Sequence, residues 1–221
     1  MPNTLIKSAL GLALGVLLIN PASAVPLTPP TNVNGTFNFD NDVEQFEFSI
    51  ATTSIVTIES IGYGGGSFAS NPAIVIGPGG FDTVLSLFDE TGAFIDDDDD
   101  DDDGLGATLV DASTGNAFDA FLQPTLAAGT YTVVITQFDN FFTGVVGDDI
   151  SLGFDFDGAP NNFTSFLGCS NGEFCDVDAN NRSNFFAINV AAQAVPEPST
   201  LALLGFGLVG AGLAYRRRQQ G

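Results

Sequence analysis

The residues best suited to chemistry in this sequence form one unbroken aspartate run. Neighbouring carboxylates raise one another's pKa, and a bound hard cation relieves their repulsion. Ca²⁺ takes about six to eight oxygen ligands, so the run is a candidate calcium site, and Asp82, Asp89 and Asp111 are weaker candidate ligands. The run comprises Asp96, Asp97, Asp98, Asp99, Asp100, Asp101, Asp102 and Asp103.

The spacing of the run matches only the first half of a known calcium-binding loop. Asp99-x-Asp101-x-Asp103-Gly104 has the oxygen spacing of an EF-hand, but the twelfth position is Val110 where that loop needs a glutamate, and no helices flank it. Two other interpretations compete with calcium binding: a solvated loop that adds solubility, and a low-complexity expansion that tolerates any number of acids. The sequence leaves all three open.

Several classes of catalysis are excluded because their groups are missing. The sequence has no His and no Trp, and Lys7 is its only lysine. Ser-His-Asp and Cys-His catalysis, His-ligated zinc or iron, and Schiff-base lysine chemistry are therefore ruled out. A glycoside hydrolase needs two carboxylates at a defined separation, one of them with a raised pKa, and no motif indicates such a pair. We expect no catalytic residues and no enzyme activity, with glycoside hydrolysis as the enzymatic alternative.

The chain is strongly acidic. Its 221 residues include five Lys and Arg against 27 Asp and Glu, a formal net charge of −22. Nucleic-acid binding is excluded, because it needs a basic stripe. Hydrophobic residues make up 44 % of the chain, with 21 Phe, which is enough for a packed core. Metal cations or salty surroundings are the natural partners of so acidic a domain.

The elements that must position the aspartate run are predicted to be β-strands. Gly-, Asn- and Asp-rich breaks separate short apolar stretches, and no convincing amphipathic helix lies between the two ends of the chain. About eight to ten antiparallel strands around one Phe-rich core predict a single all-β domain, an antiparallel β-sandwich with the jelly roll as one form of it. Alternation with period two marks strands at 37–39, 46–50, 56–58, 84–88, 93–95, 131–135, 152–156 and 186–190.

Cys169 and Cys175 lie close together in the sequence. In an exported chain such a pair most simply forms a disulfide that closes a turn, because two thiolates without a nearby His are too few for a structural zinc site. We therefore expect a disulfide that adds local rigidity.

The N-terminus predicts a secretory signal peptide over residues 1–24. Lys7 precedes an apolar run too short to span a bilayer comfortably, and the small residues Ala22 and Ala24 predict cleavage after Ala24. A buried helix or an uncleaved anchor is the alternative. An extended linker is expected over 25–32, followed by the β-sandwich domain over 33–190.

The C-terminus combines three features in order. Pro196, Glu197 and Pro198 end a predicted linker over 191–198, an apolar stretch follows from Leu201 to Tyr215, and the chain then carries an arginine cluster. Cationic residues stay on the cytoplasmic side of a membrane, so residues 199–221 predict a hydrophobic helix that inserts and leaves the domain outside. The stretch is short for a permanent span, which favours transient insertion. The cluster is Arg216, Arg217 and Arg218.

This tail resembles the PEP-CTERM sorting signal of Gram-negative bacteria, with all three parts in order over 195–221. The resemblance implies export through the Sec machinery and signal peptidase, then removal of the tail near the Pro-Glu-Pro triplet by an exosortase. Delivery would be to the cell surface, outer envelope or extracellular matrix of a bacterium that makes exopolysaccharide. The alternative is an ordinary single-span anchor, which would keep Arg216 to Arg218.

The central part is similar to bacterial pre-peptidase C-terminal (PPC-like) β-sandwich domains. The likeness rests on the stretch from Gly79 to Asp89, then Gly92, the aspartate run, and the stretch from Leu126 to Val134. It implies a noncatalytic surface module whose relatives sometimes bind calcium. The run replaces a shorter acidic segment of that family, and no protease domain precedes the module. A calcium-dependent polysaccharide- or protein-binding module is the alternative function, although the absence of Trp leaves few stacking platforms for sugars.

Overall fold

The computed structural model describes residues 27–68, 71–100, 109–169 and 174–196. In these ranges the chain forms strands and two short 3₁₀ helices. The elements are β1 (Thr31–Thr36), β2 (Glu44–Ile50), β3 (Ser54–Ser60), β4 (Gly66–Phe68), β5 (Asn71–Ile76), β6 (Thr83–Asp89), β7 (Phe94–Asp98), β8 (Phe121–Leu122), β9 (Thr125–Leu126), β10 (Gly129–Gln137), η1 (Ile150–Leu152), η2 (Phe163–Leu167) and β11 (Phe185–Ala194).

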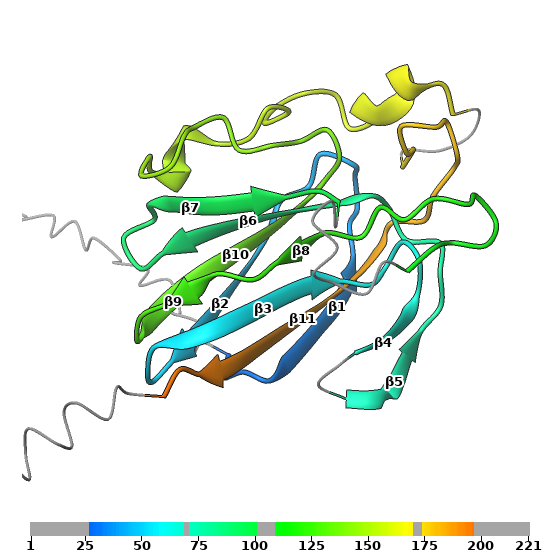
Figure 1. The fold of residues 1–221 in the computed structure, drawn as a ribbon. Helices are drawn as coiled ribbons and strands as arrows, with labels where there is room; N and C mark the ends of the chain where they lie inside the picture. Colours follow the sequence, from blue (N-terminus) through cyan, green and yellow to red (C-terminus); the bar gives the residue numbers. More distant parts are fainter. Residues whose placement is uncertain (1–26, 69–70, 101–108, 170–173, 197–221) are drawn as a thin grey trace, which may run out of the picture.

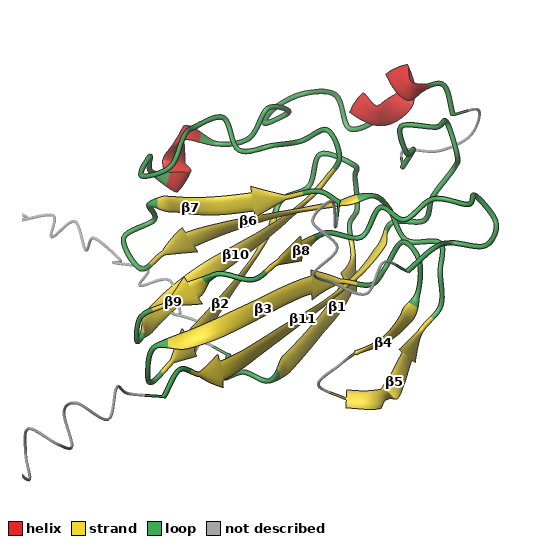
Figure 2. Ribbon diagram, in the orientation of Figure 1, coloured by secondary structure: helices red, strands yellow, loops and turns green. Residues whose placement is uncertain are grey.

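Two antiparallel sheets pack face to face, as the sequence predicts (Figures 1 and 2). The five-stranded sheet has the order β1-β11-β3-β8, with β9 also paired to β3. The four-stranded sheet has the order β2-β10-β6-β7. A separate β4–β5 hairpin lies beside the five-stranded sheet, and Ile61, Phe68 and Ala187 form the small apolar cluster that joins it to the domain. The described architecture is thus a β-sandwich with one appended hairpin.

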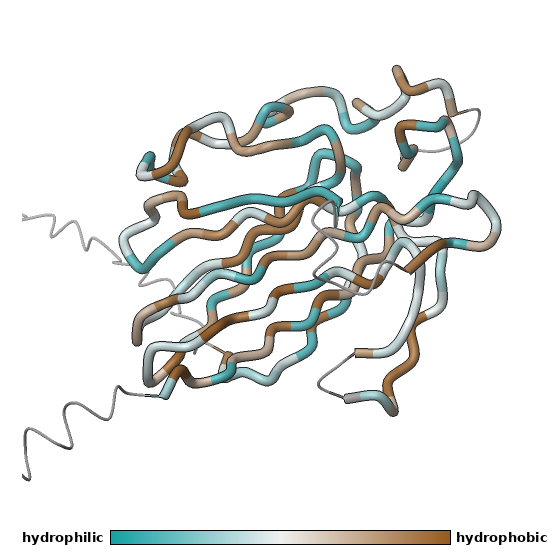
Figure 3. Tube along the Cα trace, viewed as in Figure 1, coloured by the Kyte–Doolittle hydropathy of each residue, from teal (hydrophilic) through white to brown (hydrophobic). Residues whose placement is uncertain are grey.

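Alternation with period two produces the layers. In β3 the side chains of Val56 and Ile58 are fully buried, whereas that of Ile55, the residue before Val56, is 39 % exposed. Successive side chains of a strand point to opposite faces, so one face of each sheet collects the apolar residues. The hydropathy trace shows this alternation along the strands (Figure 3).

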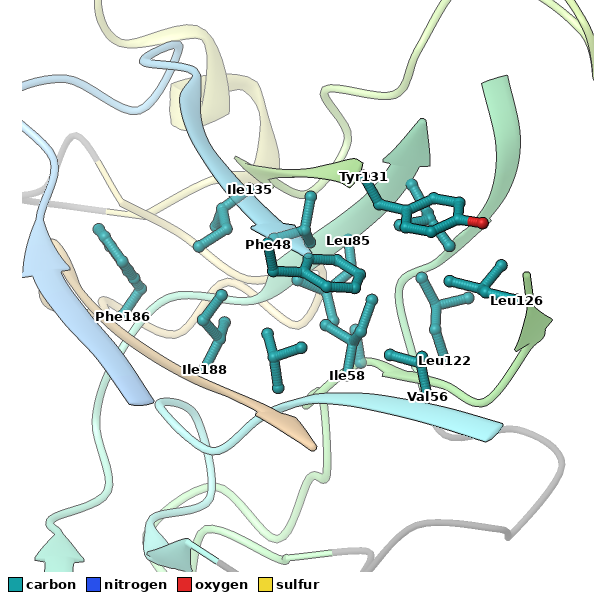
Figure 4. Close-up of a cluster of buried hydrophobic side chains, with 14 of the residues drawn as sticks. Phe48, Val56, Ile58, Leu85, Leu122, Leu126, Tyr131, Ile135, Phe186 and Ile188 are labelled. Carbon is teal, nitrogen blue, oxygen red and sulfur yellow. The ribbon is translucent and has the colours of Figure 1, made fainter. Parts of the chain in front are cut away.

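The main core fills the space between the sheets. Phe48, Leu85 and Ile135 enter it from the four-stranded sheet, and Ile58 and Ile188 enter from the five-stranded sheet (Figure 4). All five side chains are at most 1 % exposed. Burying a large apolar side chain contributes roughly 1.5 to 3 kcal/mol, so this layer is the main source of stability.

The outer face of the four-stranded sheet is also covered. Phe88 and Val134 point to that face and pack with Phe142 and Phe154 from the long segment that follows β10. The same segment runs across the top of the sheet in Figure 1. Strand β6 is therefore buried on both faces, and its residues from Thr83 to Phe88 are at most 1 % exposed.

Two predicted strands are wrong, at 37–39 and at 152–156. Asp42 accepts hydrogen bonds from the backbone N–H groups of Asn38 (2.6 Å) and Phe39 (3.0 Å), which folds the first segment into a turn. Asp157 accepts from the N–H of Phe154 (2.9 Å) in the second segment, which follows η1. Aspartates that bond nearby backbone groups favour turns over extended ladders, and alternation alone does not reveal them.

The sheet extends into both predicted linkers. Strand β1 begins at Thr31, within the segment 25–32, and β11 continues to Ala194, within 191–198. Ala194 pairs with Ser54 of β3, which keeps the end of β11 in the sheet. The flanking helices expected at 1–24 and 199–221 fall outside the described residues and stay predictions. Within the described ranges, no helix has the length and hydropathy needed to cross a membrane.

The two-sided burial of β6 leads to a stability prediction. Replacing Leu85, which is fully buried, by alanine is expected to lower the free energy of unfolding by about 2 to 5 kcal/mol, because it leaves a cavity between the sheets. Leu152→Ala is the matched control, since that side chain is 57 % exposed, and its effect should stay within about 0.5 kcal/mol. Denaturant unfolding of both variants checks this, and equal effects would contradict the assigned core.

Candidate functional site

The aspartate run begins inside a strand. Asp96, Asp97 and Asp98 belong to β7, where they pair with Leu87, Ser86 and Leu85 of β6. Their side chains alternate between the two faces of the sheet, so these three carboxylates do not form one continuous acidic surface. Asp98 Oδ2 accepts a hydrogen bond from the N–H of Phe121 (2.7 Å), which ties β7 to β8 of the other sheet. Asp101, Asp102 and Asp103 lie outside the described residues.

Five carboxylates, three of them buried, lie near the end of the sheet where β7 ends and β6 begins. Asp99 and Asp100 follow β7 directly, and Asp82 precedes β6 directly. Asp119, just before β8, and Asp176, just after Cys175, act electrostatically on Asp82 together with Asp99 and Asp100. We call these five residues the carboxylate cluster. Asp82, Asp119 and Asp176 are 3 %, 7 % and 0 % exposed, so water screens them poorly.

Asp119 and Asp176 are well supplied with hydrogen bonds. Asp119 accepts from Ser60 Oγ (2.9 Å) and from the backbone N–H groups of Tyr63 (3.0 Å) and Gly64 (2.7 Å). Asp176 Oδ2 accepts from the hydroxyl of Tyr63 (2.6 Å). Burial raises the pKa of Asp119, and these bonds partly offset the effect. Burial and the bond to Asp176 also raise the pKa of the Tyr63 hydroxyl, so it stays a donor.

Asp82 differs from these two carboxylates. Its Oδ1 atom is buried and has no hydrogen-bond partner. Burial raises the pKa of Asp82 well above its ordinary value, and repulsion from Asp100 and Asp99 raises it further. Asp82, a weaker candidate ligand in the sequence, is thus a buried carboxylate with a strongly raised pKa.

Gln137 is a polar group that the sequence analysis did not identify. It is fully buried on β10, where it pairs with Thr83, the residue next to Asp82. Its Nε2 group donates to the backbone carbonyls of Phe138 and Cys175, both at 3.2 Å, while Oε1 is buried without a hydrogen-bond partner. The sequence does contain a signal for Gln137: it lies two residues after the inward-facing Ile135, where alternation predicts an apolar side chain.

Asp111 and Asp89 do not share this location. Asp111 Oδ2 forms an ion pair with Arg182 Nη1 (2.7 Å); burial opposes its ionisation, but bonds from Ser113 and Arg182 outweigh burial and lower its pKa. Asp89 lies at the far end of β6 and its Oδ1 accepts from Thr91 and Ala93, which caps a turn. Since a strand rises about 3.3 Å per residue, Asp89 lies too far from Asp82 to share an ion with it.

Arg182 is the basic residue of the described ranges, and its side-chain N–H groups donate to acceptors other than Asp82. Besides Asp111, it donates to the carbonyls of Gly80 (2.8 Å) and Tyr63 (3.0 Å). Its guanidinium also lies 3.7 Å from the centre of the Tyr63 ring. This cation therefore supports Asp111 and Tyr63, and no hydrogen bond joins it to Asp82 in the described part of the chain.

In those same ranges, no group of three or more acidic or cysteine side chains is arranged to hold a metal ion. An ion bound at the carboxylate cluster must therefore complete its coordination with amide, backbone and water oxygens. Ca²⁺ accepts such mixed oxygen shells in flexible geometries.

A disulfide joins Cys169 to Cys175, with their Cα atoms 5.8 Å apart. In the chain-entropy view, closing so short a loop stabilises the fold by about 2 kcal/mol. The bridge also fixes the segment that presents Asp176, because Cys175 is the next residue and its carbonyl accepts from Gln137. The disulfide and the carboxylate cluster are thus parts of one neighbourhood.

Comparison with known proteins identifies the tail. Residues 194–218 match the PEP-CTERM protein-sorting motif. The tail is a sorting signal. A PEP-CTERM motif marks an exported, cell-surface-associated protein that an exosortase processes. The match covers the tail alone and assigns no family to the β-sandwich, and no curated protein matches the chain.

Several predicted signal residues fall outside the described part of the structure. These are Ala22, Ala24, Glu197, Pro198, Arg216, Arg217 and Arg218. Pro196 is described and lies two residues beyond the end of β11. The sorting motif therefore starts where the sheet ends.

The raised pKa of Asp82 predicts how stability depends on pH in metal-free buffer. Burial and repulsion from the other carboxylates of the cluster raise its folded-state pKa above the unfolded value of about 3.9. The folded state then binds this proton more tightly, so the stability is present below the unfolded pKa and is lost as pH rises through the folded pKa. We expect the melting midpoint in EDTA to fall over that window, and to fall less in Asp82→Asn. Equal pH slopes in thermal melts of the two proteins would refute the assignment.

Proposed function

We propose that this chain is a noncatalytic protein of the cell surface or extracellular matrix of a Gram-negative bacterium. It crosses the inner membrane through the Sec machinery, loses its signal peptide to signal peptidase, and is released by an exosortase near Pro196-Glu197-Pro198. The observation that carries the proposal is the PEP-CTERM motif over 194–218.

The position of the motif relative to the sheet supports release by cleavage. The last contacts of the sheet are the pairing of Ala194 with Ser54 and the hydrogen bond from the N–H of Val195 to the carbonyl of Thr53 (2.9 Å). A cut near the Pro-Glu-Pro triplet would leave these contacts in place. The domain would therefore stay folded after the tail is removed.

The N-terminal end fits processing in the same way. Leu27 donates its N–H to the carbonyl of Glu47 (2.8 Å) and accepts from the N–H of Ser49 (2.9 Å). Cleavage after Ala24 would leave this contact with β2 intact. Both processing events would thus leave the described sandwich intact.

Two observations support a noncatalytic role. The sequence has no His, so it lacks the groups for Ser-His-Asp and Cys-His catalysis and for His-ligated zinc. Asp119 and Asp176 are buried and engaged in hydrogen bonds, whereas glycosidase carboxylates must flank the scissile bond of a sugar. Polysaccharide hydrolysis that is lost in an acid-to-amide variant would overturn this part of the proposal.

A second candidate role is calcium-dependent binding of exopolysaccharide or of a matrix protein. The carboxylate cluster, with an unpartnered buried oxygen on Asp82, is the observation that favours it. The strong negative charge also favours cations over nucleic acid or anionic lipid as partners. The test is retention on the matrix polysaccharide in calcium and release by EDTA.

Processing by an exosortase predicts a specific change in mass. In a host with the exosortase, the exported wild-type protein should lack Arg216 to Arg218, and Glu197→Ala should keep them in the membrane fraction. Glu90→Ala is the control, because it removes the same charge at an exposed position outside the motif. Intact mass spectrometry decides the outcome, and surface-delivered wild-type protein that retains the arginines would contradict the proposal.

A further inference from the structure

We propose that Asp82 Oδ1 and Gln137 Oε1 bind one hard divalent cation of the Ca²⁺ class, with backbone and water oxygens completing its coordination. The site lies at the end of the four-stranded sheet where β6 begins and β10 ends. This inference goes beyond sorting and does not depend on exosortase processing. The second candidate role, calcium-dependent binding, depends on it.

The first argument is the state of Asp82. The residue is only 3 % exposed, and its Oδ1 atom makes no hydrogen bond within the protein. Burying an ionised carboxylate without a partner costs several kcal/mol, so such groups are usually paired or coordinate a metal. Asp82 is therefore a buried carboxylate whose Oδ1 atom receives no hydrogen bond from the described residues.

The second argument comes from Gln137, which is neutral and independent of the acidic residues. Its two donated bonds, to the carbonyls of Phe138 and Cys175, fix the amide and leave Oε1 without a partner. The backbone links it to Asp82, because Phe138 donates its N–H to the carbonyl of Asp82 (3.0 Å) and Thr83 pairs with Gln137. Side-chain amide oxygens are common Ca²⁺ ligands.

The third argument is the balance of charge. Asp82 faces repulsion from Asp100, Asp99, Asp176 and Asp119. Arg182 makes its side-chain contacts with Asp111, Gly80 and Tyr63 instead. A divalent cation would supply the positive charge that this edge of the sheet lacks.

The ligand chemistry selects the class of ion. The donors at this edge are oxygens, the sequence contains no His, and Cys169 and Cys175 are joined in a disulfide. Zn²⁺ and Cu⁺ prefer nitrogen and sulfur donors, so they fit poorly. Oxygens that come from separate segments suit Ca²⁺, which tolerates irregular shells at about 2.3 to 2.6 Å, better than Mg²⁺, which demands near-octahedral geometry.

A bound ion would connect parts of the chain that are distant in sequence. Asp82 directly precedes β6, and Gln137 ends β10 and bonds to the segment held by the disulfide. The ion would thus hold the start of β6, the end of β10 and the disulfide segment together. Its effect should appear in thermal stability.

The test uses the full chain, purified in mild detergent, in EDTA, in millimolar Ca²⁺ and in matched Mg²⁺. Binding to the folded state raises the melting midpoint, and we expect a calcium-selective rise of about 5 °C or more. Isothermal titration with CaCl₂ should give one bound Ca²⁺ per chain. Equal small shifts with both ions, or no stoichiometric binding, would overturn the proposal.

Two variants with the same change of charge make the test specific. Asp82→Asn should weaken Ca²⁺ binding at least about 10-fold, and should melt no lower than the wild type in EDTA, because it removes the unpaired charge. Asp96→Asn is the control: this residue is an exposed member of the aspartate run, and its variant should stay within about twofold of the wild-type affinity. Equal losses in both variants would show diffuse charge screening and overturn the site. If Asp82→Asn does not fold, the wild-type titration still decides.

Discussion

The packing of the two sheets is the constraint on which the rest of the structure depends. Every second side chain of the paired strands enters the shared core, and the segment after β10 covers the outer face of the four-stranded sheet. Strand β6 is consequently buried on both sides, and the residue that leads into it, Asp82, is buried with it. The carboxylate cluster is thus a product of the fold, because the packing that stabilises β6 also removes Asp82 from water.

The carboxylates at this end of the sheet differ in the hydrogen bonds that they accept. Arg182 donates hydrogen bonds to Asp111 and to the Tyr63 carbonyl. Tyr63 in turn donates its hydroxyl to Asp176 and its backbone N–H to Asp119. Asp82 remains with an unpartnered oxygen. The disulfide at Cys175 and the hydrogen bond that Gln137 Nε2 donates to the Cys175 carbonyl hold the segment with Asp176 in place. Rigid supports around an unsatisfied carboxylate are what a preorganised cation site requires.

The sequence predicted the sandwich because alternation is a local signal, and strands such as β3 and β10 follow it closely. It failed at 37–39 and 152–156, where Asp42 and Asp157 bond to nearby backbone N–H groups. The PEP-CTERM motif could be predicted from the sequence of the tail, and the family match over 194–218 confirms it. The helix expected over 199–221 stays a prediction. The site was only partly predictable. Composition indicated the aspartate run, whereas the proposed roles of Asp82 and Gln137 depend on strand pairing between segments that are distant in the sequence.

The tail carries the sorting signal, and we propose that the sandwich carries the cation-binding site. A crystal structure of the protein grown in Ca²⁺, with anomalous data to locate the ion, tests the cation site directly. We expect one Ca²⁺ about 2.3 to 2.6 Å from Asp82 Oδ1, with Gln137 Oε1 also coordinating it. An ordered, ion-free Asp82 whose Oδ1 bonds only to protein or water would contradict it.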